Sequence, residues 1–330
     1  MSTTFIDLFA GVGGFRYALE KHGGKCIFSS EWDKKAQESY TKFHGDTPAG
    51  DITLDSTKNQ IHTGFDILCG GFPCQAFSIA GLRKGFQDTR GTLFFDIENI
   101  AEVNRPKVLF LENVKNLVTH DKGNTFRTII EILTEKLGYY VHYKVLNTMT
   151  HANIPQNRER IFIVAFDMNQ VKDFAKFSFP EEIPLTKSIH DIIDSTKQAD
   201  KYYYQPSSKY YPDLLREVTN RDSIYQLRRI YIRENKSNVC PTLTANMGTG
   251  GHKVPIVLDD KGIRKLTPRE CANFQGFPKN YKLPEIADSQ LYKQIGNSVS
   301  IPVIKRIANC MKSVLEEKYN VEEEQCRVMS

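Results

Sequence analysis

The chain has 330 residues, of which 40% are hydrophobic and 25% charged, and this is enough to bury a sizeable core in one large or two modest domains. A formal net charge of +5 is compatible with a polyanionic partner without requiring one. No apolar stretch reaches transmembrane length and the N-terminus lacks a signal-type core, so we expect an intracellular protein. The seven cysteines contain no CxxC pair, which argues against a disulfide framework and against a zinc site.

Strand-like and helix-like segments alternate through the first half of the chain. Strands are predicted over residues 4–9, 25–29, 65–69, 108–111, 140–146 and 160–166. Helices are predicted between them, over residues 14–21, 33–40, 93–103 and 124–137. This alternation is typical of an α/β fold built on a doubly wound, mostly parallel sheet.

The alternation stops near residue 167. From about residue 183 to 257 the chain is polar, with short strand-like runs at residues 202–204 and 230–232, which predicts a second, smaller domain of mixed or β character. An amphipathic segment over residues 302–317 predicts a last helix that could return to the first domain. The tail beyond Val321 is charged and is expected to fray.

A proline–cysteine pair follows the apolar run at residues 65–69, within the segment Gly70-Gly71-Phe72-Pro73-Cys74-Gln75. Ligands bind at the carboxyl ends of parallel strands in such sheets, so Cys74 is well placed to act as a nucleophile. The alternative is an inert buried thiol. Glu112 and Asn113 end the next apolar strand, so a carboxyl group and a thiol can converge on one crevice.

A glycine turn joins the first strand to the first helix, in Phe9-Ala10-Gly11-Val12-Gly13-Gly14. The turn departs from the GxGxxG pattern, which counts against a dinucleotide. Glycine turns in general bind nucleotides, flavins and S-adenosylmethionine, so the turn alone does not identify the ligand. Some twenty residues on, Glu31 could accept hydrogen bonds from ribose hydroxyls and Trp32 could pack on an adenine face. The alternatives are that Glu31 is only a charge at the N-terminus of a helix and that Trp32 is only a core residue. Asp51, followed by Ile52, could hold an adenine amino group or be a plain turn aspartate.

Taken in order, these segments resemble the DNA (cytosine-5)-methyltransferases of bacterial restriction–modification systems. The matching segments are DLFAGVGGFR at 7–16, EWD at 31–33, GDI at 50–52, GGFPCQAFS at 70–78, DTRGTLFFD at 88–96, PKVLFLENV at 106–114, IPQNRERIFIV at 154–164, RKLTPRECANFQGFP at 264–278 and QIGNSV at 294–299. They span nearly the whole chain apart from its variable middle, and they argue against a metal or NAD enzyme.

The resemblance implies a Rossmann-like methyltransferase domain made of residues 1–182 and 285–330, and a target-recognition domain with its hinge at residues 183–284. It implies S-adenosyl-L-methionine as methyl donor, S-adenosyl-L-homocysteine as its product, and double-stranded DNA as partner. It further implies a monomer in the bacterial cytoplasm, beside a restriction endonuclease that acts on the same site without a stable complex. The chain has no extra N-terminal region, so we do not expect a regulatory multidomain enzyme.

The resemblance also implies roles for the catalytic residues. Cys74 would add to carbon-6 of cytosine, and Glu112 would bind the amino group and share a proton at ring nitrogen 3, a role that favours a raised pKa. Arg160 would face the base and the catalytic carboxylate, and Arg158 would help to hold the site. Surface salt bridging is the alternative for both arginines. Asn113 would hold the loop that carries Cys74.

The remaining assignments concern the methyl donor and the DNA. The resemblance adds Pro73, Leu93 and Asn297 to the donor pocket, with Asn297 near the carboxylate end of the donor. A stacked cytosine is out of reach of these groups, so the target base must be flipped out, under a mobile lid at residues 75–92. The residues predicted to bind DNA are Ser78, Arg83 and Arg90 in this lid, Gln226, Arg228 and Arg229 in an arginine-rich run, and Thr242, Gly250 and Gly251 in a glycine-rich recognition loop.

Three alternatives stay open at this point. The arginine-rich run could be a solvated charged face. The same motifs serve methyltransferases that act on tRNA cytosine. A DNA-binding relative that has lost catalysis is a third possibility, against which the intact Cys74, Glu112 and Arg160 argue.

Overall fold

The computed structural model describes residues 3–73, 93–249 and 253–316. Several predictions therefore lie outside the described residues: those for Cys74, Ser78, Arg83, Arg90, Gly250, Gly251, the lid at residues 75–92 and the tail beyond Val321. Within the described part of the chain, no helix is both long and apolar enough to cross a membrane.

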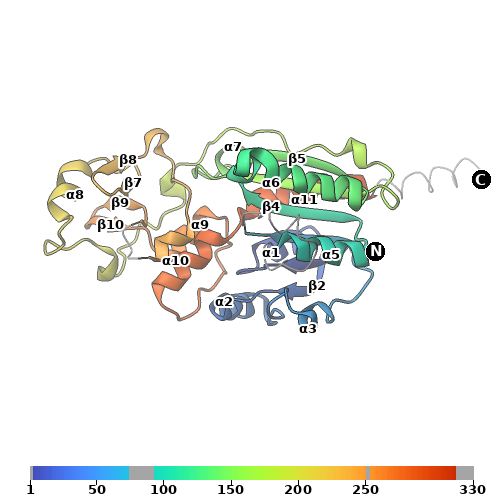
Figure 1. The fold of residues 1–330 in the computed structure, drawn as a ribbon. Helices are drawn as coiled ribbons and strands as arrows, with labels where there is room; N and C mark the ends of the chain where they lie inside the picture. Colours follow the sequence, from blue (N-terminus) through green and yellow to red (C-terminus); the bar gives the residue numbers. More distant parts are fainter. Residues whose placement is uncertain (1–2, 74–92, 250–252, 317–330) are drawn as a thin grey trace, which may run out of the picture.

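A six-stranded sheet forms the larger part of the molecule (Figure 1). Its strands are β1 (Thr4–Leu8), β2 (Lys25–Ser30), β3 (Ile67–Gly71), β4 (Val108–Val114), β5 (Tyr139–Asn147) and β6 (Glu159–Asp167). They lie in the order β2-β1-β3-β4-β6-β5, and β6 runs opposite to the other five strands, so that it pairs antiparallel with both β4 and β5. The predicted doubly wound, mostly parallel sheet is confirmed.

Helices cover both faces of this sheet, which is why its central strands are largely apolar, with Asp7 on β1 and Glu112 and Asn113 on β4 as buried polar exceptions. On β4, Val108 and Phe110 belong to one buried cluster, whereas Leu109 and Leu111 belong to another. Successive side chains of a strand point to opposite faces, so one strand supplies two cores.

Five helices of this part lie within a few residues of their predicted positions, and two short ones, at residues 55–58 and 148–152, were not predicted. They are α1 (Gly14–Glu20), α2 (Lys34–His44), α3 (Asp55–Lys58), α5 (Phe94–Asn104), α6 (Asn124–Glu131), α7 (Thr148–Ala152) and α11 (Ile301–Glu316). Asp33 caps α2 by accepting from the backbone amides of Lys35 and Ala36. The helix predicted over residues 124–137 changes at Ile132 into a π-helical segment, Ile132–Lys136, in which the Thr134 hydroxyl donates to the Ile130 carbonyl.

A second sheet of four short antiparallel strands lies apart from the first (Figure 1). Its strands are β7 (Tyr225–Leu227), β8 (Ile232–Glu234), β9 (Ile256–Asp259) and β10 (Gly262–Lys265), in the order β10-β9-β7-β8, with α8 (Tyr211–Glu217) beside them. Two strand predictions are wrong in detail. Residues 200–202 form a 3-10 turn, after which Tyr203 makes only an isolated bridge, and Ile230 and Tyr231 lie in the exposed turn before β8.

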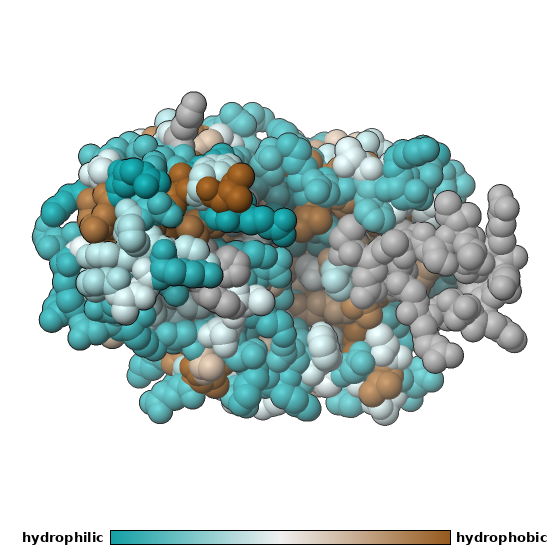
Figure 2. Space-filling view, turned by 60° about the vertical axis from the view of Figure 1, so that its left-hand side comes forward, coloured by the Kyte–Doolittle hydropathy of each residue, from teal (hydrophilic) through white to brown (hydrophobic). Residues whose placement is uncertain are grey.

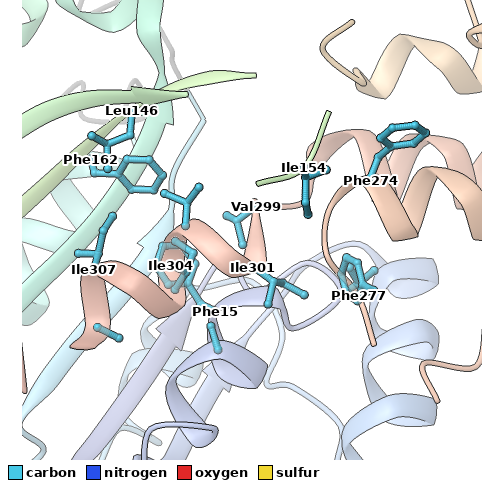
Figure 3. Close-up of a cluster of buried hydrophobic side chains, with 14 of the residues drawn as sticks. Phe15, Leu146, Ile154, Phe162, Phe274, Phe277, Val299, Ile301, Ile304 and Ile307 are labelled. Carbon is cyan, nitrogen blue, oxygen red and sulfur yellow. The ribbon is translucent and has the colours of Figure 1, made fainter. Parts of the chain in front are cut away.

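Helices α9 (Pro268–Phe274) and α10 (Asp288–Asn297) lie between the two sheets, and α11 returns to the first (Figure 1). Figure 3 shows Ile304 and Ile307 of α11 near Phe15 of α1 and Phe162 of β6. The same buried cluster continues to Phe274 at the end of α9. The last helix therefore packs on the first sheet, as predicted, and one continuous apolar core joins the two parts of the molecule.

Candidate active site

A cavity of about 310 Å³ lies at the carboxyl ends of β1, β3 and β4. This volume falls at the lower end of the range of roughly 300–1,000 Å³ for small-molecule sites. Predicted site residues that line it are Phe9, Ala10, Gly11, Gly14, Glu31, Trp32, Pro73, Leu93, Glu112, Asn113, Arg158, Arg160 and Asn297. The structure thus brings residues from opposite ends of the chain into one wall.

The glycine turn forms one side of this cavity. Gly11 and Gly13 have φ angles of 56° and 80°, in the left-handed region that favours glycine. A Cβ atom on Gly13 would lie 2.1 Å from Nε2 of His44, and one on Gly14 would lie 2.8 Å from Cγ2 of Val299. The turn can therefore follow this path only with glycines, which leaves its backbone open to a ligand.

Glu31 fastens this turn to the end of β2. Its Oε2 accepts from the Gly11 amide at 2.8 Å, and its Oε1 accepts from the Asp33 amide at 2.8 Å. Burial raises the pKa of the Glu31 carboxyl above its ordinary value. Beside it, Trp32 is 68% exposed, so the alternative of a core tryptophan is excluded and a flat aromatic face is available in the cavity wall.

The structure does not bring Asp51 and Ile52 into the described lining of the cavity. Oδ1 of Asp51 accepts from the amide and the hydroxyl of Thr53, both at 2.9 Å, which is the arrangement of a turn aspartate. Ile52 is buried in a core cluster. Contact of these two residues with an adenine stays a prediction.

Glu112 and Arg160 form an ion pair in the cavity wall. Arg160 lies opposite Val114 in the β4–β6 register, two residues from Glu112, so both side chains leave the same face of the sheet. Nε of Arg160 lies 3.1 Å from Oε1 of Glu112, and both side chains are largely buried. Burial raises the pKa of Glu112, which Arg160 and Arg158 partly oppose, so this carboxyl is suited to holding or sharing a proton.

Arg158 is 2% exposed, so it is not a surface residue. Its guanidinium donates to the carbonyl of Leu243 at 2.8 Å and to that of Ser298 at 2.5 Å. Burial lowers the pKa of Arg158 to about 9. The side chain therefore joins three segments that are far apart in sequence.

Asn113 fixes the chain just before the predicted nucleophile. Its Nδ2 donates to the carbonyl of Phe72 at 2.9 Å, and its Oδ1 accepts from the amide of Val114 at 2.8 Å. Phe72 lies two residues before Cys74, which itself lies outside the described residues. This contact supports the prediction that Asn113 holds the loop carrying Cys74.

Comparisons with known proteins agree on one family. The family model described as C-5 cytosine-specific DNA methylase matches residues 3–313. The chain belongs to this family. It is 51% identical to the type II methyltransferase M.Bsp6I of Bacillus sp. (strain RFL6), over 94% of this chain and 98% of the relative. It is 44% identical to M.HpaII of Haemophilus parainfluenzae, over 96% and 90%, and 42% identical to M.HhaI of Haemophilus parahaemolyticus, over 95% and 95%.

Solved structures show the same fold. The Dnmt2 methyltransferase of S. pombe superposes with a TM-score of 0.70 at 20% identity, covering 94% of this chain and 99% of that chain. A Spodoptera frugiperda DNMT2 mutant gives 0.68 at 19% identity, over 96% and 100%. This chain is therefore a DNA (cytosine-5) methyltransferase with a Rossmann-like fold and a smaller second sheet.

The family implies S-adenosyl-L-methionine as methyl donor, and the chemistry of the cavity wall is compatible with that group. The wall contains the backbone of the glycine turn, a buried carboxyl group at Glu31 and an exposed aromatic face at Trp32. The amide nitrogen of Gln294, another lining residue, is buried without a partner in the described structure. A buried donor without a partner is what a polar ligand would satisfy.

The predicted DNA-reading residues occupy two places in the second part of the methyltransferase. Arg228 and Arg229 are exposed in the β7–β8 turn, where Arg228 donates to Oε1 of Gln226 at 2.8 Å. Thr242 donates to the carbonyl of Asn157 at 2.6 Å, which ties its loop to the segment before Arg158. Figure 2 shows a largely hydrophilic face with hydrophobic side chains gathered in a recess near its middle.

Among the cavity residues that sequence reasoning missed, three have charged or amide side chains: Asp33, Lys293 and Gln294. Lys293 of α10 forms an ion pair with Asp33 at 2.8 Å, and Oε1 of Gln294 accepts from the Ser39 hydroxyl at 2.6 Å. Asp33 and Gln294 belong to matched segments, but no role had been assigned to their side chains. The available signal was the spacing of three residues between Gln294 and Asn297, which places both on one side of α10.

Proposed function

We propose that this enzyme methylates carbon-5 of a cytosine within a specific sequence of double-stranded DNA, as the modification enzyme of a restriction–modification system. One observation carries the proposal: the Glu112–Arg160 pair lies in the wall of the same cavity as Glu31 and Trp32. A group suited to holding a proton on cytosine thus faces a site suited to S-adenosyl-L-methionine. The type II methyltransferases to which the chain is similar support the restriction–modification context.

The chemistry needs a nucleophile because carbon-5 of cytosine is too electron-poor to take a methyl group unaided. In the proposed step, the Cys74 thiolate forms a bond to carbon-6, and the electron pair of the 5,6 double bond becomes available at carbon-5. S-adenosyl-L-methionine, when bound, supplies an electrophilic methyl group. After transfer, the carbon-5 proton leaves to a base, the double bond re-forms and the thiolate is expelled.

Glu112 balances charge during this addition. Its raised pKa allows it to hold a proton and share it with ring nitrogen 3, while its oxygens accept from the exocyclic amino group. Arg160, at 3.1 Å, fixes the orientation of the carboxyl. The Arg160 cation limits the rise in the pKa of Glu112, so the carboxyl can give its proton to ring nitrogen 3 when the thiolate adds, while the raised pKa lets the proton return when the thiolate leaves.

Two residues position this machinery. Asn113 holds the backbone at Phe72, and Arg158 holds the loops at Leu243 and Ser298. The proposed S-adenosyl-L-methionine site consists of the glycine turn with Phe9 and Ala10, the β2 end with Glu31 and Trp32, and the lining residues Pro73, Leu93 and Asn297. Asp51 and Ile52 are further proposed contacts.

The chain divides, in this proposal, into a catalytic domain of residues 1–182 and 285–330 and a target-recognition domain at 183–284. DNA lies between them, with the target base flipped out under the lid at residues 75–92. Arg228, Arg229 and Gln226 read bases, and Thr242 orders the recognition loop. The enzyme acts as a monomer, and a restriction endonuclease cleaves the same site without forming a stable complex with it.

The test is transfer of labelled methyl groups from S-adenosyl-L-methionine to DNA and, separately, to tRNA. We expect transfer to DNA by the wild type and none by Cys74→Ser. Cys310→Ser, on the half-buried side of α11, is a matched control that keeps its activity. Transfer to tRNA but not DNA, or full activity of Cys74→Ser, would contradict the proposal.

A further inference from the structure

Gln294 stands out among the polar residues of the cavity wall. It lies on α10 and is 8% exposed, and its side chain lines the cavity. Its Oε1 accepts from the Ser39 hydroxyl at 2.6 Å, whereas its Nε2 is buried without a hydrogen-bond partner in the described structure. A buried donor without a partner is costly, so its place in a ligand cavity calls for an acceptor from the ligand.

The surrounding contacts hold the Gln294 amide in place. Ser39 is fully buried on α2, so the bond to Oε1 fixes one end of the amide group. One residue earlier, Lys293 pairs with Oδ2 of Asp33 at 2.8 Å, while Oδ1 of the same Asp33 caps α2. The hydrogen bond and the ion pair hold α10 against α2, so the Nε2 group of Gln294 keeps one orientation before a ligand binds.

Two elements of the cavity wall differ in the polar groups they carry, and they meet where Lys293 pairs with Asp33. The end of β2 offers carboxylate oxygens from Glu31 and Asp33, and these suit the ribose hydroxyls, which donate. Helix α10 offers donors instead: the amides of Gln294 and Asn297 and the ammonium group of Lys293. The strongest acceptor on the methyl donor is the carboxylate of its amino-acid end, so the α10 side of the cavity matches that end.

We propose that Gln294 binds the carboxylate of the methyl donor through its Nε2 group. The inference rests on the proposed function, because it takes S-adenosyl-L-methionine as the ligand of this cavity. It adds a binding residue whose position is set by Ser39, and it explains why an amide, and not an apolar side chain, lines this part of the wall.

The experiment compares two ligands that differ at the amino-acid end. S-adenosyl-L-homocysteine carries the carboxylate, whereas 5′-methylthioadenosine has the same adenosine part without it. Trp32 is the only tryptophan of the chain and lines the cavity, so its fluorescence reports the binding of either ligand. The variants are Gln294→Met and the nearly isosteric Gln294→Glu, with Gln290→Met on the same helix as matched control.

We expect Gln294→Met to weaken binding of S-adenosyl-L-homocysteine by roughly 10- to 100-fold, the range for a hydrogen bond to a charged group. Binding of 5′-methylthioadenosine should change less than about twofold, and Gln290→Met should affect neither ligand. Gln294→Glu should weaken S-adenosyl-L-homocysteine at least as much, because it opposes two negative charges. If circular dichroism shows that Gln294→Met does not fold, the binding of the two ligands is compared between Gln294→Glu and the wild type.

An equal loss for both ligands would overturn the inference, because Gln294 would then only support the helices. Unchanged binding of S-adenosyl-L-homocysteine by both variants would overturn it as well. Failure of the wild type to bind S-adenosyl-L-homocysteine at all is a different result. It would refute the proposed function itself, so the two failures can be told apart.

Discussion

Asp7 offers a test of how burial acts beneath the glycine turn. It lies on β1 and is fully buried, and its Oδ2 accepts from the amide of Arg16 on α1 at 3.3 Å. Burial raises the pKa of Asp7 to about 7 from its ordinary value of 3.8, although the nearby Arg16 opposes the shift. The folded protein therefore prefers a protonated Asp7 over much of the accessible pH range.

The magnitude follows from the linkage between protonation and folding. The gap between about 7 and 3.8, at about 1.36 kcal/mol per pKa unit, corresponds to about 4 kcal/mol. Because the folded pKa is the higher one, this contribution is fully present below pH 3.8 and is lost as the pH rises to about 7. Asp7→Asn cannot ionise, so its stability advantage over the wild type should be about 2 kcal/mol at pH 5 and about 4 kcal/mol at pH 8.

The assay is urea unfolding of the wild type and of Asp7→Asn at pH 5 and pH 8. The pH-dependence of all other groups is common to both proteins, so the change in this difference between pH 5 and pH 8, roughly 2–3 kcal/mol, isolates Asp7. Asp260→Asn, at an exposed position, controls for the loss of an aspartate. Equal differences at the two pH values would refute the reasoning.

Three further predictions concern the active site. Glu112→Gln should lower the rate of methyl transfer by roughly 10²- to 10⁴-fold, while tryptophan fluorescence shows unchanged binding of S-adenosyl-L-homocysteine; weakened binding would argue for a structural role. Arg158→Met leaves two buried carbonyl groups without their donor and should lower the free energy of unfolding in urea by about 2–5 kcal/mol; a loss below about 1 kcal/mol would contradict this account. Glu31→Gln should weaken S-adenosyl-L-homocysteine binding by roughly tenfold in the same fluorescence titration, and a change below twofold would count against ribose binding.

Local sequence patterns were sufficient to predict the strands of the first sheet and many of the residues that line the cavity. The run Val108–Leu111 is apolar because helices cover both faces of the sheet, and this makes a central strand easy to recognise. The glycines at 11, 13 and 14 mark a turn with positive φ angles at Gly11 and Gly13 and with close neighbouring atoms at Gly13 and Gly14. Glu112 and Asn113 could be placed at the cavity because they end such a strand.

Other features depend on contacts between distant parts of the chain. Arg158 could be taken for a surface residue, because its partners at Leu243 and Ser298 are 85 and 140 residues away. Gln294 gained a role only from the fold, which places it against Ser39, 255 residues away. The strands of the second sheet are three or four residues long and partly polar, which leaves little periodicity for prediction.

The most direct test of the central claim is capture of the covalent bond between Cys74 and carbon-6. The substrate is a duplex carrying the site that bisulfite sequencing identifies in cells expressing the protein, with 5-fluorocytosine in place of the target cytosine. Fluorine cannot leave carbon-5 as a proton does, so the final elimination is blocked. With S-adenosyl-L-methionine, the account predicts a protein–DNA complex that survives denaturing electrophoresis for the wild type and is absent for Cys74→Ser. A wild type that methylates the normal duplex but forms no such complex would contradict it.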